Sequence, residues 1–299
     1  MIRVNNINKT FDDIKALNDL SLNVKKGTVY GLIGPNGAGK TTIIKHLTGV
    51  YKQDSGEIKI ADQAVYENIA LKTKTVCIGD DLYFFSTYTI RDMANFYKGL
   101  YPDWDEERFL TLKEVFKIDL KRKIKKLSKG MQKQVAFWLG ICTKPDVLIL
   151  DEPVDGLDPV MRKNVWKLLL SDVAEREMTV LVSSHNLREL EDVCDHVGIM
   201  HKGQVVLEKS LDEAKGNIHK VQTAFKGEFP EEIKEKIEIL HFEQFGSVYS
   251  LIVKGDIDEI KSVISDYSPI ILDTLALTLE EVFIYELGGL GYETTGIIL

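Results

Sequence analysis

A glycine-rich turn that ends in lysine and threonine is the first part of this sequence that could do chemistry. Residues Gly34-Pro35-Asn36-Gly37-Ala38-Gly39-Lys40-Thr41 satisfy the pattern G-x-x-x-x-G-K-[ST]. Small residues let successive backbone N–H groups turn inward and hold phosphate oxygens. In that arrangement Lys40 reaches the β- and γ-phosphates of a nucleotide, and the Thr41 hydroxyl ligates Mg²⁺. The alternative is a glycine-rich turn with a chance lysine.

Two adjacent carboxylates follow an apolar run further along the chain. Residues 147–153 read VLILDEP, which is typical of a buried strand that ends in acidic residues. Because neighbouring residues on a strand point to opposite faces, Asp151 and Glu152 cannot share one role. We expect Asp151 to hold Mg²⁺ through water and Glu152 to face the γ-phosphate as the general base for an attacking water. A solvated turn is the alternative, and the phosphate-binding turn upstream favours function.

The elements around these residues predict an α/β fold. Apolar runs predict strands at 28–33, 75–79, 147–151, 179–183 and 197–201, and helical periodicity predicts helices near 40–49, 90–100, 105–117, 130–143, 160–176 and 186–193. Continuous apolar strands that alternate with helices indicate a mainly parallel sheet buried on both faces. The helix-rich stretch 85–143 interrupts this alternation, which predicts a helical subdomain inserted into the core.

A change of composition after about residue 216 predicts a second domain. From there the predicted order is strand 219–226, helix 230–238, strand 239–244, strand 247–254, helix 256–264, strand 269–274 and helix 279–287. Two β-α-β units in this order are typical of a ferredoxin-like α+β module. The prediction is therefore a P-loop NTPase core over 1–216 and a small accessory domain over 217–299.

Composition narrows the classes of partner. The 299 residues include 38 Lys+Arg and 46 Asp+Glu, for a formal charge of −8. That acidity argues against nucleic-acid binding, which needs a basic surface. Three widely spaced cysteines (Cys77, Cys142 and Cys194) favour a reduced, cytosolic compartment. The polar N-terminus resembles no signal peptide and no apolar run approaches ~20 residues, so we expect a soluble protein.

Further motifs occur in the order typical of ABC ATPases, and residues 1 to about 215 resemble that family. Leu127-Ser128-Lys129-Gly130-Met131-Gln132 resembles the family's LSGGQ signature, with Lys129 in place of a small residue. The resemblance implies that Ser128 and Gly130 bind the γ-phosphate of ATP held by the opposite subunit. The alternative for Ser128 is a serine N-cap that opens an amphipathic helix.

Two loops near the acidic pair extend the resemblance. Gly156-Leu157-Asp158-Pro159 resembles the D-loop, which crosses the dimer interface, although Asp158 as a helix N-cap explains the same residues. Ser184-His185-Asn186 resembles the switch histidine, which contacts the γ-phosphate and positions water. His185 also follows a predicted parallel strand, where such sheets bind ligands. The predicted catalytic residues are therefore Lys40, Glu152 and His185.

The resemblance implies two more contacts. Phe11 stands where the family has an aromatic ring that stacks on adenine, and a packing role in the sheet is the alternative. The family usually has a glutamine after the strand at 75–79, where it senses Mg²⁺ and water, but Asp80 occupies that position here, with Asp81 as the alternative equivalent. A carboxylate there can accept a hydrogen bond from metal-bound water. The predicted metal residues are Thr41, Asp151 and Asp80, and the predicted nucleotide contacts are Phe11, Gly34, Pro35, Asn36, Gly37, Ala38, Gly39, Lys40, Thr41, Thr42, Ser128, Gly130 and Asp158.

Membership of this family would imply ATP and Mg²⁺ as ligands and two kinds of partner. One ATPase unit without a membrane span implies separate permease subunits, whose coupling helix would enter a groove between the helical subdomain and the core. A second ATPase subunit, identical or related, would complete the site. The implied location is cytoplasmic, at the inner face of the cell membrane.

A narrower resemblance points to one branch of the family. Residues 279–283 (LEEVF) resemble an element of bacterial exporter ATPases of the bacitracin-resistance type. Residues 11–17, 80–82 and 102–105 resemble a branch found in antibiotic-responsive operons and often linked with acetoin utilisation. The alternative is a non-transport ABC ATPase that acts as a regulatory switch, with 217–299 sensing a ligand.

Overall fold

The computed structural model describes residues 1–153, 156–211, 213, 218–275 and 277–289. The chain divides into two compact units, one made of 1–186 with 193–208 and the other of 187–192 with the described residues from 209 onward. The predicted boundary at 216/217 lies outside the described residues.

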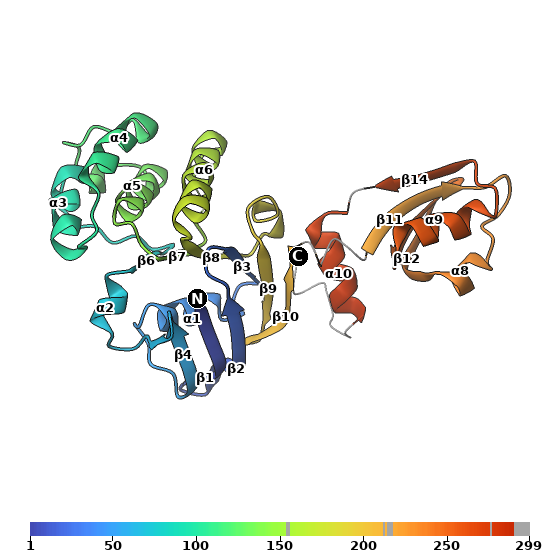
Figure 1. Ribbon diagram of the computed structural model, residues 1–299, viewed down its shortest axis with the longest axis horizontal. Helices are drawn as coiled ribbons and strands as arrows, with labels where there is room; N and C mark the ends of the chain where they lie inside the picture. Colours follow the sequence, from blue (N-terminus) through green and yellow to red (C-terminus); the bar gives the residue numbers. More distant parts are fainter. Residues whose placement is uncertain (154–155, 212, 214–217, 276, 290–299) are drawn as a thin grey trace. The chain divides into compact units, whose positions relative to one another are not determined.

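The first unit is built on a six-stranded sheet whose central strands are parallel (Figure 1). In spatial order the strands are β10 (Gln204–Ser210), β9 (His196–His201), β3 (Val29–Ile33), β8 (Thr179–Ser184), β7 (Val147–Asp151) and β6 (Thr75–Ile78). Every residue of β3, β7 and β8 is buried, as expected for a parallel sheet covered on both faces. The prediction of an α/β core is confirmed.

A second sheet in this unit was not predicted. Its antiparallel strands are β2 (Ile14–Val24), β1 (Ile2–Phe11), β4 (Ser55–Ile60) and β5 (Gln63–Ala64). In β1 the pairing with β2 shifts register between Val4 and Thr10, so buried Ile2, Val4 and Ile7 do not alternate strictly with exposed residues. Because the period of two is broken, the sequence pattern does not indicate a strand there.

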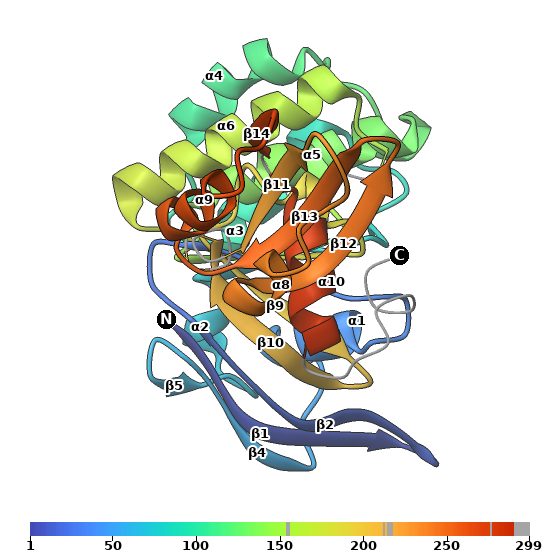
Figure 2. The same cartoon turned by 90° about the vertical axis from the view of Figure 1, so that its right-hand side faces the viewer.

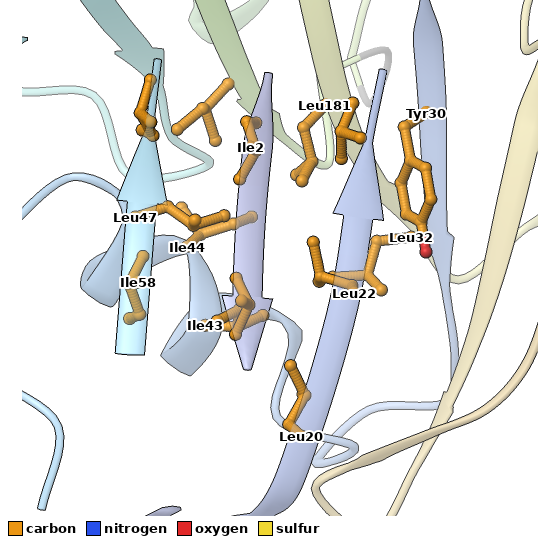
Figure 3. Packing of buried hydrophobic residues seen from close by; sticks show 14 of the residues in the cluster. Ile2, Leu20, Leu22, Tyr30, Leu32, Ile43, Ile44, Leu47, Ile58 and Leu181 are labelled. Carbon is orange, nitrogen blue, oxygen red and sulfur yellow. The ribbon is translucent and has the colours of Figure 1, made fainter. Parts of the chain in front are cut away.

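Helix α1 (Lys40–Leu47) packs between the two sheets. Its buried Ile43, Ile44 and Leu47 point toward Ile2 and Ile58 of the antiparallel sheet (Figure 3). The same buried cluster continues to Leu32 of β3 and Leu181 of β8. The helix that follows the glycine-rich turn is therefore fixed along its length by apolar contacts on both sides.

Three helices form the inserted subdomain: α3 (Ile90–Leu100), α4 (Glu106–Phe116) and α5 (Lys129–Cys142). Side-chain N-caps start all three, from Thr89, Asp105 and Ser128 respectively. Their shared core is aromatic. The Trp138 ring stacks on Phe109 at 4.9 Å and on Phe116 at 5.4 Å between centroids, and its indole N–H donates to the Phe109 carbonyl at 2.9 Å. The elements near 105–143 match their predicted positions, and α6 (Pro159–Arg176) follows them.

The second unit has the predicted ferredoxin-like order (Figure 2). Its elements are β11 (Ile218–Ala224), α8 (Ile233–Lys236), β12 (Glu238–Phe245), β13 (Val248–Lys254), α9 (Ile257–Ser265) and β14 (Ile271–Leu275), and then α10 (Leu279–Gly289). The antiparallel strand order β12-β13-β11-β14 agrees with that module. Phe229, Tyr249 and Leu251 lie in its core.

One predicted helix is wrong. The segment 186–193 forms only a 3₁₀ turn over Leu187–Glu189.

A short helix that was not predicted, α2 (Ile69–Lys72), precedes β6. Within the described residues, every helix is too short or too polar to cross a bilayer.

The aromatic core of the helical subdomain gives a stability prediction. Replacement of the fully buried Phe109 by alanine removes the ring that Trp138 stacks on and leaves a cavity, at a cost of about 3–5 kcal/mol. Leu110 is the next residue of α4 and is 48% exposed, so Leu110→Ala is a matched control with an expected cost below ~1 kcal/mol. Denaturant unfolding followed by tryptophan fluorescence measures both. Equal costs would contradict the packing described.

Candidate nucleotide-binding site

The glycine-rich turn and the start of α1 form one wall of a cavity of about 550 Å³. Gly39 precedes α1 with φ +106°, and no side chain caps that helix end. The first N–H groups of α1 therefore keep their hydrogen-bonding capacity for an anion. The predicted contacts on the wall are Asn36, Gly37, Gly39, Lys40, Thr41 and Thr42, and the other lining residues include Lys15, Ala16, Asp80, Asp151, Glu152, Lys202 and Gly203.

Lys40 is held inside the turn that precedes it. Its buried Nζ donates to the carbonyl oxygens of Gly34 at 2.6 Å and Pro35 at 3.3 Å. Ala38 closes the turn, since its N–H also donates to the Pro35 carbonyl, at 3.1 Å. The Lys40 ammonium lies 3.5 Å from a carboxylate oxygen of Glu152, so the glycine-rich turn and the acidic pair after β7 are in direct contact.

Thr41 and Asp151 meet at the cavity wall. The Thr41 hydroxyl donates to Asp151 Oδ2 at 2.9 Å, and the Ser183 hydroxyl donates to Asp151 Oδ1. Ser183 ends up beside Asp151 because β7 and β8 run parallel with these two residues in register. A hydroxyl and a carboxylate are the hard oxygen ligands that Mg²⁺ prefers, so this donor set fits the predicted metal.

Glu152 and His185 form a second polar pair at the ends of the same strands. His185 Nδ1 lies 2.9 Å from Glu152 Oε2, while Glu152 Oε1 faces Lys40. Glu152 has φ +47°, in the left-handed region that few non-glycine residues adopt. Such outliers gather at functional sites because neighbouring contacts must hold them in place. The structure thus brings together Lys40, Glu152 and His185, the three residues predicted to be catalytic.

Of the two acidic residues after β6, Asp80 lines the cavity beside the glycine-rich turn and Asp81 does not. Asp81 lines a neighbouring cavity of about 360 Å³, to which Lys129 and Gly156 also contribute. Asp80 Oδ1 lies 3.6 Å from the ammonium of Lys133 on α5. This placement favours Asp80 over Asp81 as the residue in the glutamine position of the family.

Phe11 lies beside the cavity rather than in its lining. It pairs with Ile14 across the β1–β2 turn, and Ile14 does line the cavity. The Phe11 ring is 37% exposed and packs on Tyr51 at 5.2 Å, which in turn contacts His46 at 5.7 Å. Burial lowers the pKa of His46 despite its hydrogen bond to the Thr42 carbonyl, so this imidazole is neutral at pH 7. The Phe11 ring is thus held in place by Tyr51 and still partly open to solvent, which suits it to stacking on a nucleotide base.

The other predicted contacts with nucleotide lie away from this cavity. Ser128 caps α5 by accepting from Met131 N–H at 3.2 Å, and Asp158 caps α6 by accepting from the N–H groups of its first turn. A Cβ on Gly130 would lie 2.4 Å from the Gly156 carbonyl oxygen, so glycine is required where the first turn of α5 meets the backbone at Gly156. Within one chain these residues do not share the cavity with Lys40.

Several residues of the site were missed from the sequence. Ser183 binds Asp151, and its position at the end of the predicted strand 179–183 was an available signal. Lys133 donates to the Glu152 carbonyl at 2.7 Å, and no local pattern indicated that contact. Lys202 and Gly203, which lie between β9 and β10 and line the cavity, were also missed.

The glycine-rich turn gives a steric prediction. A Cβ on Gly34 would lie 2.3 Å from the Met200 carbonyl oxygen of β9, so Gly34→Ala must displace the turn. We expect nucleotide affinity to fall by at least about 10-fold, since misplaced groups lose their contacts. In Gly99→Ala, on the exposed side of α3, the same methyl group meets nothing within 4 Å and should change neither affinity nor fold. Fluorescent-nucleotide titration measures both, and wild-type affinity in Gly34→Ala would contradict the prediction.

Comparisons with known proteins agree with this geometry. A family model described as ABC transporter matches residues 17–155. The chain is 31% identical over 289 residues to the ABC transporter ATP-binding protein YtrB of Bacillus subtilis, covering 97% of this chain and 99% of that protein. It is 32% identical to the bacitracin transport ATP-binding protein BcrA of Bacillus licheniformis, over 72% of this chain and 71% of the relative.

Solved structures give the same result. The structure of an ATP-binding subunit of an ABC transporter superposes with a TM-score of 0.69 at 26% identity, over 72% of this chain and 92% of that one. The match to YtrB extends through the second unit, and the resemblance to the bacitracin-resistance branch is confirmed. The link with acetoin utilisation stays a prediction. A match over nearly the whole of YtrB, together with the converging phosphate, acidic and histidine motifs, places this chain in the family of ATP-binding subunits of ABC transporters.

Proposed function

We propose that this chain is the ATPase of a bacterial exporter and that it drives separate membrane subunits by ATP-dependent closure of two copies. The observation that carries the proposal is the convergence of Lys40, the Thr41–Asp151 pair and Glu152 on one cavity, with His185 held against the Glu152 carboxylate beside it. The names of the relatives support the exporter branch: BcrA is a bacitracin transport protein and SrtF of Streptococcus pyogenes a lantibiotic transport protein.

Phosphate binding comes from backbone and one cation. The free N–H groups at the start of α1 and the inward-facing turn surround the β- and γ-phosphates, and Lys40 exchanges its contacts with the Gly34 and Pro35 carbonyls for phosphate oxygens. The exposed Phe11 ring stacks on the base through its π face. Since stacking does not read base edges, we expect weak selectivity among nucleotides.

Mg²⁺ would be held by the Thr41 hydroxyl and, through water, by Asp151, with Asp80 accepting from a metal-bound water. Bound there, the ion would offset the negative charge of the β- and γ-phosphate oxygens. Ser183 fixes the Asp151 carboxylate from the other side, so the metal ligand keeps one orientation.

Hydrolysis uses the Glu152–His185 pair. Glu152 accepts a proton from water as the water oxygen attacks the γ-phosphorus, the bond from that phosphorus to the β,γ-bridging oxygen breaks, and ADP leaves with the electron pair. His185 holds the Glu152 carboxylate through Oε2 while it contacts the γ-phosphate. Positioning and charge stabilisation supply most of the catalysis in phosphoryl transfer. Lys40 contributes the charge stabilisation because it remains beside both the phosphate and Glu152.

A second copy would complete each site. Ser128, Gly130 and Asp158 lie outside the cavity of their own chain, and the start of α5, where Ser128 is the N-cap, can bind the γ-phosphate of ATP held by another subunit through the Ser128 hydroxyl and the first backbone N–H groups. The fold relative MJ0796 is a dimeric ABC transporter cassette. Permease subunits would dock on the helical subdomain from the membrane, with this chain at the cytoplasmic face.

The base assignment gives a direct prediction. Glu152→Gln removes the proton acceptor but keeps the shape of the side chain, so we expect ATP binding to persist and turnover to fall by at least about 100-fold. The variant should accumulate as a closed dimer with Mg-ATP, because closure no longer ends in hydrolysis. Light scattering measures the mass, and a phosphate-release assay measures turnover.

Glu114→Gln, at an exposed position of α4, is the matched control and should behave as the wild type. Wild-type turnover in Glu152→Gln would overturn the base assignment. Tight ATP binding with a monomeric mass would instead indicate that closure needs a related ATPase or the membrane subunits.

A further inference from the structure

Lys133 is a lysine whose side chain is almost entirely removed from water. It lies on α5, about one turn after the helix begins at Lys129, and is only 5% exposed. Lysine is rarely buried to this extent unless its ammonium is paired. Its Nζ donates to the backbone carbonyl of Glu152 at 2.7 Å and lies 3.6 Å from Asp80 Oδ1. A single cation therefore contacts both the loop after β7 and the loop after β6.

The Glu152 backbone needs such support. Its φ of +47° is unfavourable for a residue with a Cβ, so surrounding contacts must hold it. The N–H donates to the Ser183 carbonyl at 3.2 Å, and the side chain is fixed by His185 and Lys40. Lys133 binds the carbonyl, the remaining polar group of the residue. Of these contacts it is the one made by the helical subdomain rather than by the sheet and its loops.

Asp80 supplies the other half of the arrangement. It is 65% exposed at its side chain, lines the phosphate cavity and precedes the subdomain in the chain. A shift of the Asp80 loop toward the phosphates would change the distance between Asp80 and the Lys133 ammonium. Because the same ammonium donates to the Glu152 carbonyl, the shift would also act on the backbone of Glu152. The charge-assisted contacts make that link stronger than neutral hydrogen bonds would.

We propose that Lys133 is a positioning residue for ATP hydrolysis, which transmits the position of the Asp80 loop to the backbone of Glu152. The inference rests on the proposed function, in which Glu152 is the base. Lys133 itself touches neither water nor phosphate in this scheme. It sets the direction of the Glu152 carboxylate and makes that direction depend on whether Asp80 is in place.

Graded substitutions separate the two contacts. Lys133→Gln keeps a hydrogen-bond donor for the Glu152 carbonyl but removes the charge that attracts Asp80, whereas Lys133→Met removes both. We expect kcat to fall by about 10- to 100-fold in Lys133→Met and by less in Lys133→Gln, with KM and nucleotide affinity within about twofold of the wild type. Lys113→Met, at an exposed position of α4, is the control and should leave kcat unchanged.

A double-mutant cycle tests the link to Asp80. Asp80→Asn in the wild-type background should lower kcat, and the same change in Lys133→Gln should lower it by a smaller factor, because the attraction to the Lys133 charge has already gone and only the proposed contact of Asp80 with metal-bound water is left to lose. If the two substitutions lower kcat by independent factors, Asp80 acts independently of Lys133. That result would reject the proposal that Lys133 transmits the position of the Asp80 loop to Glu152. If Lys133→Met does not fold, the cycle with Lys133→Gln still decides.

Two outcomes distinguish failure of this inference from failure of the proposed function. Wild-type kcat in both Lys133 variants, with turnover lost in Glu152→Gln, would reject the role of Lys133 and leave the base assignment intact. Losses of kcat, affinity and melting temperature in parallel would mean that Lys133 only supports the fold. Wild-type turnover in Glu152→Gln would instead remove the function on which the inference rests.

Discussion

The parallel register of β3, β7 and β8 is the constraint on which the rest of the site depends. Ile33 pairs with Ser184, and Asp151 pairs with Ser183, so all three strands end at one edge of the sheet. The phosphate turn, the acidic pair and the histidine each follow one of these strands. Because side chains alternate between faces, a slip of one residue in β7 would turn Asp151 away from Thr41.

The apolar core converts this register into a fixed geometry. Strands with every residue buried cannot slide without exposing side chains, and α1 is packed between two sheets by Ile43, Ile44 and Leu47. Burial at about 25 cal/mol per Å² resists any displacement of the helix. The left-handed conformation of Glu152 can persist only on so rigid a base.

The parts that were predictable from the sequence are those that local pattern encodes. The turn at 34–41 follows from the spacing of its glycines and lysine, α3 follows from its periodicity, and α5 follows from its periodicity and the serine at its start. The sheet containing β1 was missed because its register shifts break the alternation. Lys133 was missed because its partner is a backbone carbonyl 19 residues away, which no side-chain pattern reports. Asp80 and Asp81 are adjacent carboxylates, and only the conformation of the loop after β6 shows which of them lines the cavity beside Lys40.

The short segment 187–192 belongs by its contacts to the second compact unit, although it follows His185 almost directly. Within that unit α10 packs on the turn Leu187–Glu189, and Arg188 pairs with Glu280 at 2.8 Å. Leu187 and Leu190 are buried. A truncation after β10 would therefore remove α10 together with the rest of the second unit. It would leave the turn at Leu187–Glu189, which closely follows His185 in the chain, without the helix that packs on it. If such a fragment were inactive, the cause could be either disruption of the turn after His185 or loss of the second unit's own contribution. Single substitutions in the intact chain therefore separate the roles of the two units better than truncation does.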